Sequence, residues 1–214
     1  MKQTKTKLLF LMTLMASFVL TACGQQFDAS RYVKACLDAN THGEFADYVE
    51  LTNISEEDAA KQYNDLLDDE VSYLDDYNID ADTKQKFRDL FENMYKNFKY
   101  EVGEATKNDD NSYSVPVTTY KMQIFGDISA DMETYITNYY QEQMDAGNTP
   151  STDEAYAVVV DYLYDYISKN MENITYADPV TTTVTVAPTD NVYSISDSEL
   201  QDLLSSMLDF ENLQ

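Results

Sequence analysis

The hydrophobic periodicity of this chain changes four times, and that order of periods is the strongest constraint on its fold. Between residues 28 and 98, apolar side chains recur every three to four positions, which is the spacing of amphipathic helices. Residues 100–124 alternate as strands do, helical spacing returns over 132–171, alternation resumes over 180–195, and 200–208 is helical again. The order predicts an α+β fold with N-terminal helices, an antiparallel sheet of about four strands interrupted by a helical hairpin, and a C-terminal helix.

Capping residues indicate where the helices begin. Asp28 is expected to cap the first helix, with Phe27 placed to pack against Tyr32 as a hydrophobic staple. The short connection 145–152 favours an antiparallel pairing of the two helices that it joins. We expect the other helices to begin at these polar residues: the capping box Thr41-His42-Gly43-Glu44, Ser55, Asp80 or Asp82, and the box Ser196-Asp197-Ser198-Glu199.

The second predicted strand contains a change of phase. Turn-forming residues over 108–111 separate it from the strand before. The apolar residues of 113–117 share one phase, whereas those of 120–124 lie one residue out of step. A shift of one residue near Thr118 predicts a β-bulge, which would bend the strand.

The first 23 residues have the order of parts of a secretory signal. Three lysines precede the apolar run Leu8 to Leu20, and Leu20-Thr21-Ala22-Cys23 ends it. A transmembrane helix would need about 20 apolar residues. The ending resembles the lipobox of bacterial lipoproteins. This resemblance implies cleavage before Cys23, fatty acyl chains such as palmitate on Cys23, and attachment to the extracytoplasmic face of the cell membrane.

The chain is therefore expected to divide into three parts: a signal peptide at 1–22, the lipidated Cys23 with a short tether at 23–27, and a single acidic α+β domain at 28–214. After cleavage, 11 basic and 39 acidic side chains remain, a net charge of −28. Such a field repels nucleic acid and anionic lipid headgroups, so no nucleic-acid partner is expected. The charge serves solubility in a polyanionic envelope, or it attracts cations or basic partners.

Few residues suit nucleophilic catalysis. His42 is the chain's one histidine, and its position on a polar turn predicts a surface side chain. Cys36 is expected to be buried on the apolar face of the first helix, without a disulfide, because lipidation occupies Cys23. The sequence thus predicts no catalytic residue, no metal ligands and no cofactor, and a Cys36–His42 pair is disfavoured by the burial of the thiol.

The abundant carboxylates leave two alternatives open. A carboxylate-dependent hydrolase of the envelope agrees with the residue types. A cation-dependent interaction protein would use a calcium site, and Asp76, Asn78, Asp80 and Asp82 alternate like the start of an EF-hand loop. That pattern fails, because Ala81 stands where the loop needs Gly and Phe87 stands where it needs the bidentate Glu. The charge density alone would also allow a weak cation site of another kind among Asp68, Asp69, Glu70, Asp75 and Asp76.

Two short segments resemble a known family. Asn40-Thr41-His42-Gly43-Glu44-Phe45 is similar to the first helix junction of nuclear-transport-factor-2-like domains, and Val192-Tyr193-Ser194-Ile195-Ser196-Asp197 is similar to their final strand. Together they resemble lipoproteins of Gram-positive bacteria that carry such a cystatin-like α+β domain behind a lipobox. The resemblance implies the fold, which hosts enzymes, ligand-binding proteins and interaction modules alike.

The leading prediction is a membrane-anchored, non-catalytic module that binds a small apolar or aromatic ligand, or a protein partner in the envelope. The concave face of its sheet would hold the ligand. Residues expected either to line such a site or to form plain core are Tyr113, Val115, Val117, Tyr120, Met122, Val184 and Tyr193.

Overall fold

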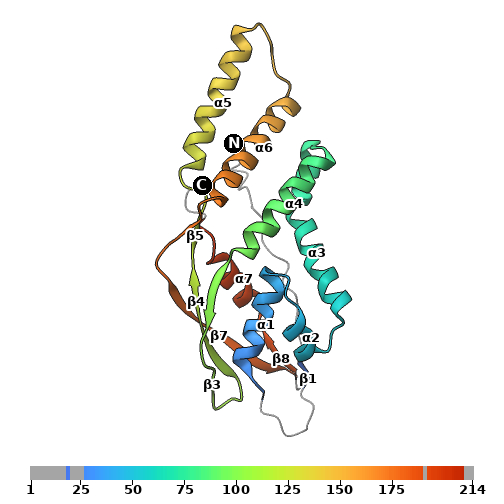
Figure 1. The fold of residues 1–214 in the computed structure, drawn as a ribbon, viewed down its shortest axis with the longest axis vertical. Helices are drawn as coiled ribbons and strands as arrows, with labels where there is room; N and C mark the ends of the chain where they lie inside the picture. Colours follow the sequence, from blue (N-terminus) through green and yellow to red (C-terminus); the bar gives the residue numbers. More distant parts are fainter. Residues whose placement is uncertain (1–17, 20–26, 190–191, 210–214) are drawn as a thin grey trace.

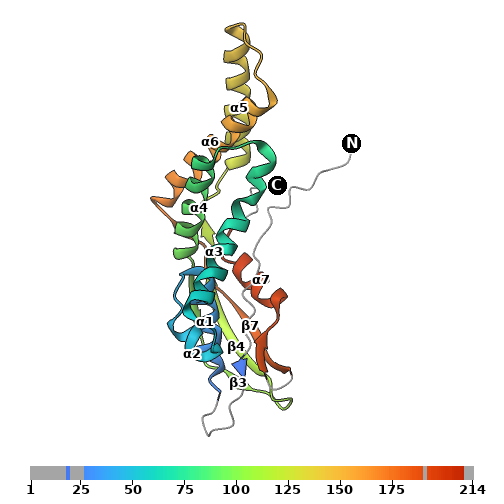
Figure 2. The same cartoon turned by 90° about the vertical axis from the view of Figure 1, so that its right-hand side faces the viewer.

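The computed structural model describes residues 18–19, 27–189 and 192–209. The molecule is elongated, with the sheet and helices α1, α2 and α7 at one end and the hairpin of α5 and α6 at the other (Figures 1 and 2). The predicted signal peptide lies outside the described residues except for strand β1 (Phe18–Val19). Cys23 also lies outside them. Among the helices described, none has the length and apolar character needed to cross a membrane.

The N-terminal half is helical, as predicted. Asp28 caps α1 by accepting a hydrogen bond from the Arg31 amide at 2.9 Å, and the Phe27 and Tyr32 rings lie 5.6 Å apart. Ser55 and Asp80 cap the third and fourth helices. The elements are α1 (Ala29–Thr41), α2 (Ala46–Thr52), α3 (Glu56–Ser72), the 3-10 helix η1 (Tyr73–Tyr77) and α4 (Ala81–Lys96).

The predicted capping box at 41–44 is wrong. Thr41 is the last residue of α1, and its hydroxyl donates to the Leu37 carbonyl at 2.7 Å instead of capping α2. Phe45 precedes α2 without a side-chain cap. The spacing of Thr41 and Glu44 matches a capping box. However, a threonine at the end of a helix can instead donate its hydroxyl to the carbonyl four residues earlier, as Thr41 does.

The predicted antiparallel sheet is confirmed. Its four main strands are β2 (Lys99–Val102), β4 (Tyr113–Tyr120), β7 (Val180–Thr189) and β8 (Val192–Ile195), in the order β8-β7-β4-β2. The short β1 pairs with β8, and β3 (Thr106–Lys107) pairs with β4. Buried side chains of β4 and β7 pack with α1 and α7 (Asp197–Ser205) into one core.

The expected bulge near Thr118 is wrong. Strand β4 pairs with β7 in one continuous register, from Tyr113 opposite Val186 to Thr119 opposite Val180. The chain leaves this sheet at Lys121 and enters a second, two-stranded sheet of β5 (Met122–Gln123) and β6 (Thr175–Tyr176). The change of phase therefore records a change of sheet, because each sheet sets its own inward direction.

The helical hairpin consists of α5 (Ile128–Asp145) and α6 (Thr152–Met171), whose capping box at Ser151 and Glu154 is complete. The two helices project beyond the rest of the molecule (Figures 1 and 2). Strands β5 and β6 join the hairpin to the body on either side. The pairing of its two flanking strands sets the base of the hairpin and directs it away from the sheet.

Candidate functional site: an exposed hairpin and a polar cluster

The sequence-predicted ligand-lining residues lie mainly in the hydrophobic core. Their apolar side chains pack in the same core as those of α1 and α7. Buried are Tyr113, Val115, Val117, Met122, Val184 and Tyr193. Tyr120 lies on the opposite face of β4, where its hydroxyl donates to Glu101 at 2.8 Å and Lys99 Nζ stands 4.4 Å from its ring centroid.

Cys36 is buried, as predicted, and is a free thiol. Burial raises the pKa of the Cys36 thiol from 9.0 to about 12, while a hydrogen bond with Tyr32 lowers it less. The thiol therefore stays protonated at physiological pH. A protonated thiol is a poor nucleophile.

The acidic residues near η1 serve the helices around them. Asp80 caps α4 by accepting from the Thr83 amide at 2.9 Å. Asp68 pairs with Arg88 at 2.6 Å, and Asp75 pairs with Lys84. Within the described residues, none of these carboxylates joins a group of three metal-ligating side chains.

The outer part of the hairpin exposes aromatic and apolar side chains. Met144 is 68% exposed, Tyr135 44%, Tyr156 41% and Tyr140 38%. Some of these rings contact other tyrosines: Tyr135 stacks on Tyr162 with centroids 4.7 Å apart, and Tyr156 lies tilted against Tyr77 of η1 at 4.6 Å. The hairpin surface, by which we mean the exposed side chains of 128–171, thus presents tyrosine rings and a methionine to water.

The hairpin surface is also strongly acidic. Residues 128–171 contain seven tyrosines, eight aspartates and glutamates, and one lysine. Tyrosine offers a large contact area and a hydroxyl at low conformational cost, which is why it is enriched in binding surfaces. The arrangement suits a partner with both apolar contacts and positive charge.

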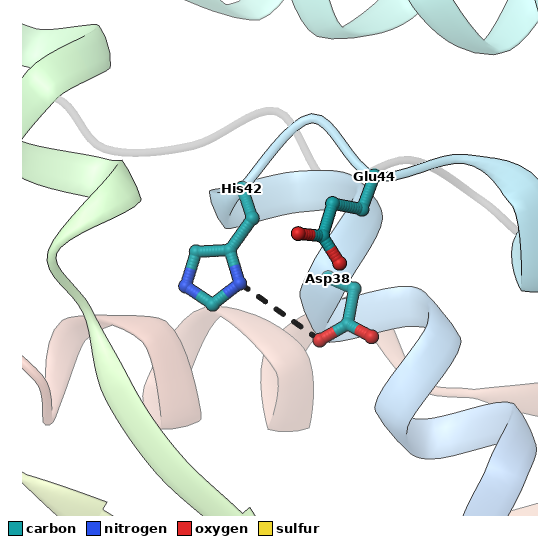
Figure 3. Close-up of side chains that lie close together, drawn as sticks. All are labelled: Asp38, His42 and Glu44. Atoms are coloured by element: carbon teal, nitrogen blue, oxygen red, sulfur yellow. Dashed lines mark ion pairs between the residues drawn. The ribbon is translucent and has the colours of Figure 1, made fainter.

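A cluster of polar side chains lies where α1 meets β2 (Figure 3). Asp38 is 7% exposed, and its Oδ1 accepts a 2.6 Å hydrogen bond from the Tyr100 hydroxyl. Lys34 Nζ lies 2.5 Å from Asp38 Oδ2. Burial, and then the bond to Asp38, raises the pKa of Tyr100 well above its ordinary value. The ring of His42 stacks on that of Tyr100 with centroids 5.4 Å apart.

His42, predicted to lie at the surface, is half-buried in the structure. Its side chain is 26% exposed, and Nε2 lies 3.1 Å from the carbonyl oxygen of Phe98, at the start of β2. Nδ1 lies 3.9 Å from Asp38 Oδ1. The sequence places His42 on a polar turn, but this turn is packed against a strand 56 residues later.

Comparison with known proteins shows a shared fold. No protein-family model and no curated protein matches the chain. The crystal structure of a candidate lipoprotein, YcdA, from Bacillus subtilis subsp. subtilis is similar, with a TM-score of 0.58 and 18% sequence identity. The similarity covers 85% of this chain and 56% of YcdA, so the chain spans little more than half of that protein. At this identity the likeness establishes the α+β fold alone.

Proposed function

We propose that this protein is a lipid-anchored, extracytoplasmic binding protein without catalytic activity, and that its hairpin surface holds a positively charged protein partner. The lipobox-like ending at Cys23 supports the anchor, and the fold shared with the candidate lipoprotein YcdA agrees with it. The observation that carries the binding role is the exposed, acidic and aromatic surface of α5 and α6.

The position of the tether supports this role. Phe27 stacks on Tyr193 of β8 at 4.2 Å and touches Tyr113 at the start of β4, so the chain enters the body at the end opposite to the hairpin (Figure 1). Cys23 is four residues before Phe27, and an extended chain spans at most about 3.6 Å per residue. With Cys23 in the membrane, the hairpin would point away from the lipid surface.

Exposed apolar area on the hairpin favours a bound partner. Helix α6 also packs against α4, where the Tyr164 and Phe87 rings lie 5.6 Å apart, so the apolar side chains left exposed are mainly those of α5 and the outer part of α6. Most helical stability in proteins comes from packing of an apolar face. In α5, Ile128 is buried, whereas the following positions are half-buried or exposed. A partner that covers Tyr135, Tyr140 and Met144 would remove that area from water.

Charge selects the class of partner. Eight carboxylates against one lysine repel nucleic acid, anionic lipid and a second copy of the same hairpin. Lysine and arginine side chains of a protein partner would pair with the carboxylates and lie over the tyrosine rings. A basic protein of the envelope therefore fits this surface best.

Photocrosslinking in intact membranes tests the proposal. A photoreactive residue replaces Met144 in the full-length protein, and the same residue replaces the exposed Asp109, in the loop between β3 and β4 at the other end, as a control. We expect one discrete adduct from position 144 and no such adduct from position 109. The adduct should weaken in high salt and with Glu142→Gln plus Asp145→Asn, but not with Asp109→Asn.

Two results would contradict the proposal. One is an identical adduct from both positions, which would indicate nonspecific contact. The other is an adduct from position 144 whose yield is indifferent to salt and to the loss of the two neighbouring carboxylates, since a cationic partner must respond to both.

A further inference from the structure

We infer that Asp38, His42 and Glu44 form a binding site for one divalent transition-metal ion, for which Zn²⁺ is the probe. One carboxylate oxygen from each acid and one imidazole nitrogen all lie within 4.8 Å of one another. Figure 3 shows the three side chains converging at the C-terminal end of α1. The site lies in the body of the molecule and is independent of the proposed hairpin surface.

Hydrogen bonding fixes which imidazole nitrogen is free to bind. The Phe98 carbonyl oxygen, 3.1 Å from His42 Nε2, can only accept, so Nε2 carries the proton. When the proton is on Nε2, Nδ1 has a lone pair that can bind a metal. A histidine that ligates a metal typically donates its other N–H to a backbone carbonyl or carboxylate, which is the arrangement at His42.

No neighbouring hydroxyl supplies a proton to Nδ1. The Tyr100 hydroxyl lies 3.4 Å from Nδ1 but gives its one hydrogen to Asp38 Oδ1 at 2.6 Å. The hydroxyl of Thr41 donates to Leu37 at 2.7 Å. Among the described residues, the Nδ1 lone pair thus faces two carboxylates with no donor between them. Three electron-rich atoms so arranged attract a cation.

The backbone holds this geometry. The amides of His42 and Glu44 both donate to the Asp38 carbonyl, at 2.9 and 3.2 Å. Gly43 between them has φ +66°, and a Cβ there would lie 3.2 Å from the Tyr63 ring. A glycine lets the chain reverse tightly here, because other residues adopt this conformation at a cost and would also meet Tyr63.

The surroundings leave access for an ion and water. Asp38 is held by Tyr100, whereas Lys34 is 57% exposed at its side chain and can move out when a cation of higher charge binds. Glu44 is exposed, so positions beyond the three protein ligands would be filled by water. One imidazole with two carboxylates suits Zn²⁺, whereas Ca²⁺ prefers six to eight oxygen ligands.

The single histidine makes a direct test possible. Full-length protein labelled with ¹⁵N-histidine is purified in detergent micelles and titrated with Zn²⁺ while the His42 imidazole nitrogens are observed by NMR. Without metal we expect the neutral ring with its proton on Nε2. One equivalent of Zn²⁺ should shift the Nδ1 resonance strongly and leave the proton on Nε2.

Matched variants separate this site from the other carboxylates. Glu44→Gln is expected to weaken Zn²⁺ binding at least tenfold, and His42→Gln should abolish the tight site. Glu104→Gln, an exposed carboxylate near the end of β2, should change nothing. Circular dichroism checks that each variant is folded, and Glu44 is exposed, so its substitution keeps the test valid if His42→Gln unfolds.

Three outcomes would overturn the inference. In the first, stoichiometric Zn²⁺ leaves both His42 resonances unchanged. In the second, His42 is a doubly protonated imidazolium at neutral pH that does not respond to Zn²⁺, so a proton rather than a metal balances the carboxylates. In the third, all variants bind Zn²⁺ as the parent does, which would indicate an adventitious ion only.

Discussion

At the scale of residues, a hydrogen bond from a tyrosine hydroxyl to a carboxylate occurs in two environments. Tyr100 donates to Asp38 at 2.6 Å where α1 meets β2, and Tyr120 donates to Glu101 at 2.8 Å on the outer face of the sheet. Asp38 is buried and Glu101 is exposed. Water replaces the tyrosine hydroxyl more easily at the exposed Glu101 than at the buried Asp38. The two hydrogen bonds should therefore differ in their effect on stability.

Removing the Tyr100 hydroxyl should destabilise the fold. Tyr100→Phe leaves a carboxylate with one fewer donor in a largely buried site, and hydrogen bonds to charged groups contribute about 1.5–3 kcal/mol. Urea unfolding should show a loss of that order in the free energy of unfolding. The control Tyr120→Phe should change the free energy of unfolding little, because water can replace the tyrosine hydroxyl at the exposed carboxylate of Glu101. Equal losses in the two variants would show that burial of Asp38 is not what matters.

At the scale of elements, α1 and α5 represent opposite extremes of packing. Ten of the 13 residues of α1 are buried, whereas Ile128 is the one buried residue among those described in α5. Both helices have a periodic apolar pattern. The difference arises because α1 packs against the sheet and against α2, α3 and α4, whereas the main contacts of α5 are with α6.

We expect this difference in amide hydrogen exchange. Amides of α5 beyond its first turn should exchange faster than those of α1, because local opening there exposes little apolar surface. Hydrogen–deuterium exchange read out by mass spectrometry gives both rates in one sample of full-length protein. The α1 peptides serve as the internal reference. Equal protection of the two helices would mean that the hairpin opens only with the whole domain.

The switch from β4 to β5 shows a limit of periodicity at the same scale. The pattern over 113–124 correctly indicates extended chain with a change of phase. It does not distinguish a bulge within one sheet from a step between two sheets. That choice depends on the partner strands, β7 for one half and β6 for the other, and these lie more than 50 residues later.

At the scale of the whole molecule, Cys23→Ala tests the anchor. Without acyl chains, the chain has no described helix able to cross a membrane and carries a strongly negative charge that anionic lipid repels. We expect the variant to move from the membrane fraction to the soluble fraction. Membrane and soluble fractions are compared by immunoblotting.

The matched control is Cys36→Ala, because the buried thiol plays no part in attachment. This variant should remain with the membrane, as the parent protein does. A Cys23→Ala protein that still sediments with membranes would contradict the lipid anchor.

Local sequence already determined the order of helical and extended segments, the caps at Asp28 and Ser55, and a cap at either Asp80 or Asp82. These features follow from the spacing of apolar residues and from hydrogen bonds between near neighbours, so a short window contains the cause. The resemblance-based nuclear-transport-factor-2-like assignment and the lipidation of Cys23 stay predictions.

Tertiary structure decided which side chains are buried by elements far away in the sequence. It put all the expected ligand-lining residues except Tyr120 into the core, packed the His42 ring against Phe98 and Tyr100, and left the outer part of the hairpin uncovered. Each of these three outcomes depends on contacts between elements that are tens of residues apart in the sequence. The period of a helix indicates that one face is apolar, but only the assembled fold determines whether anything packs against that face.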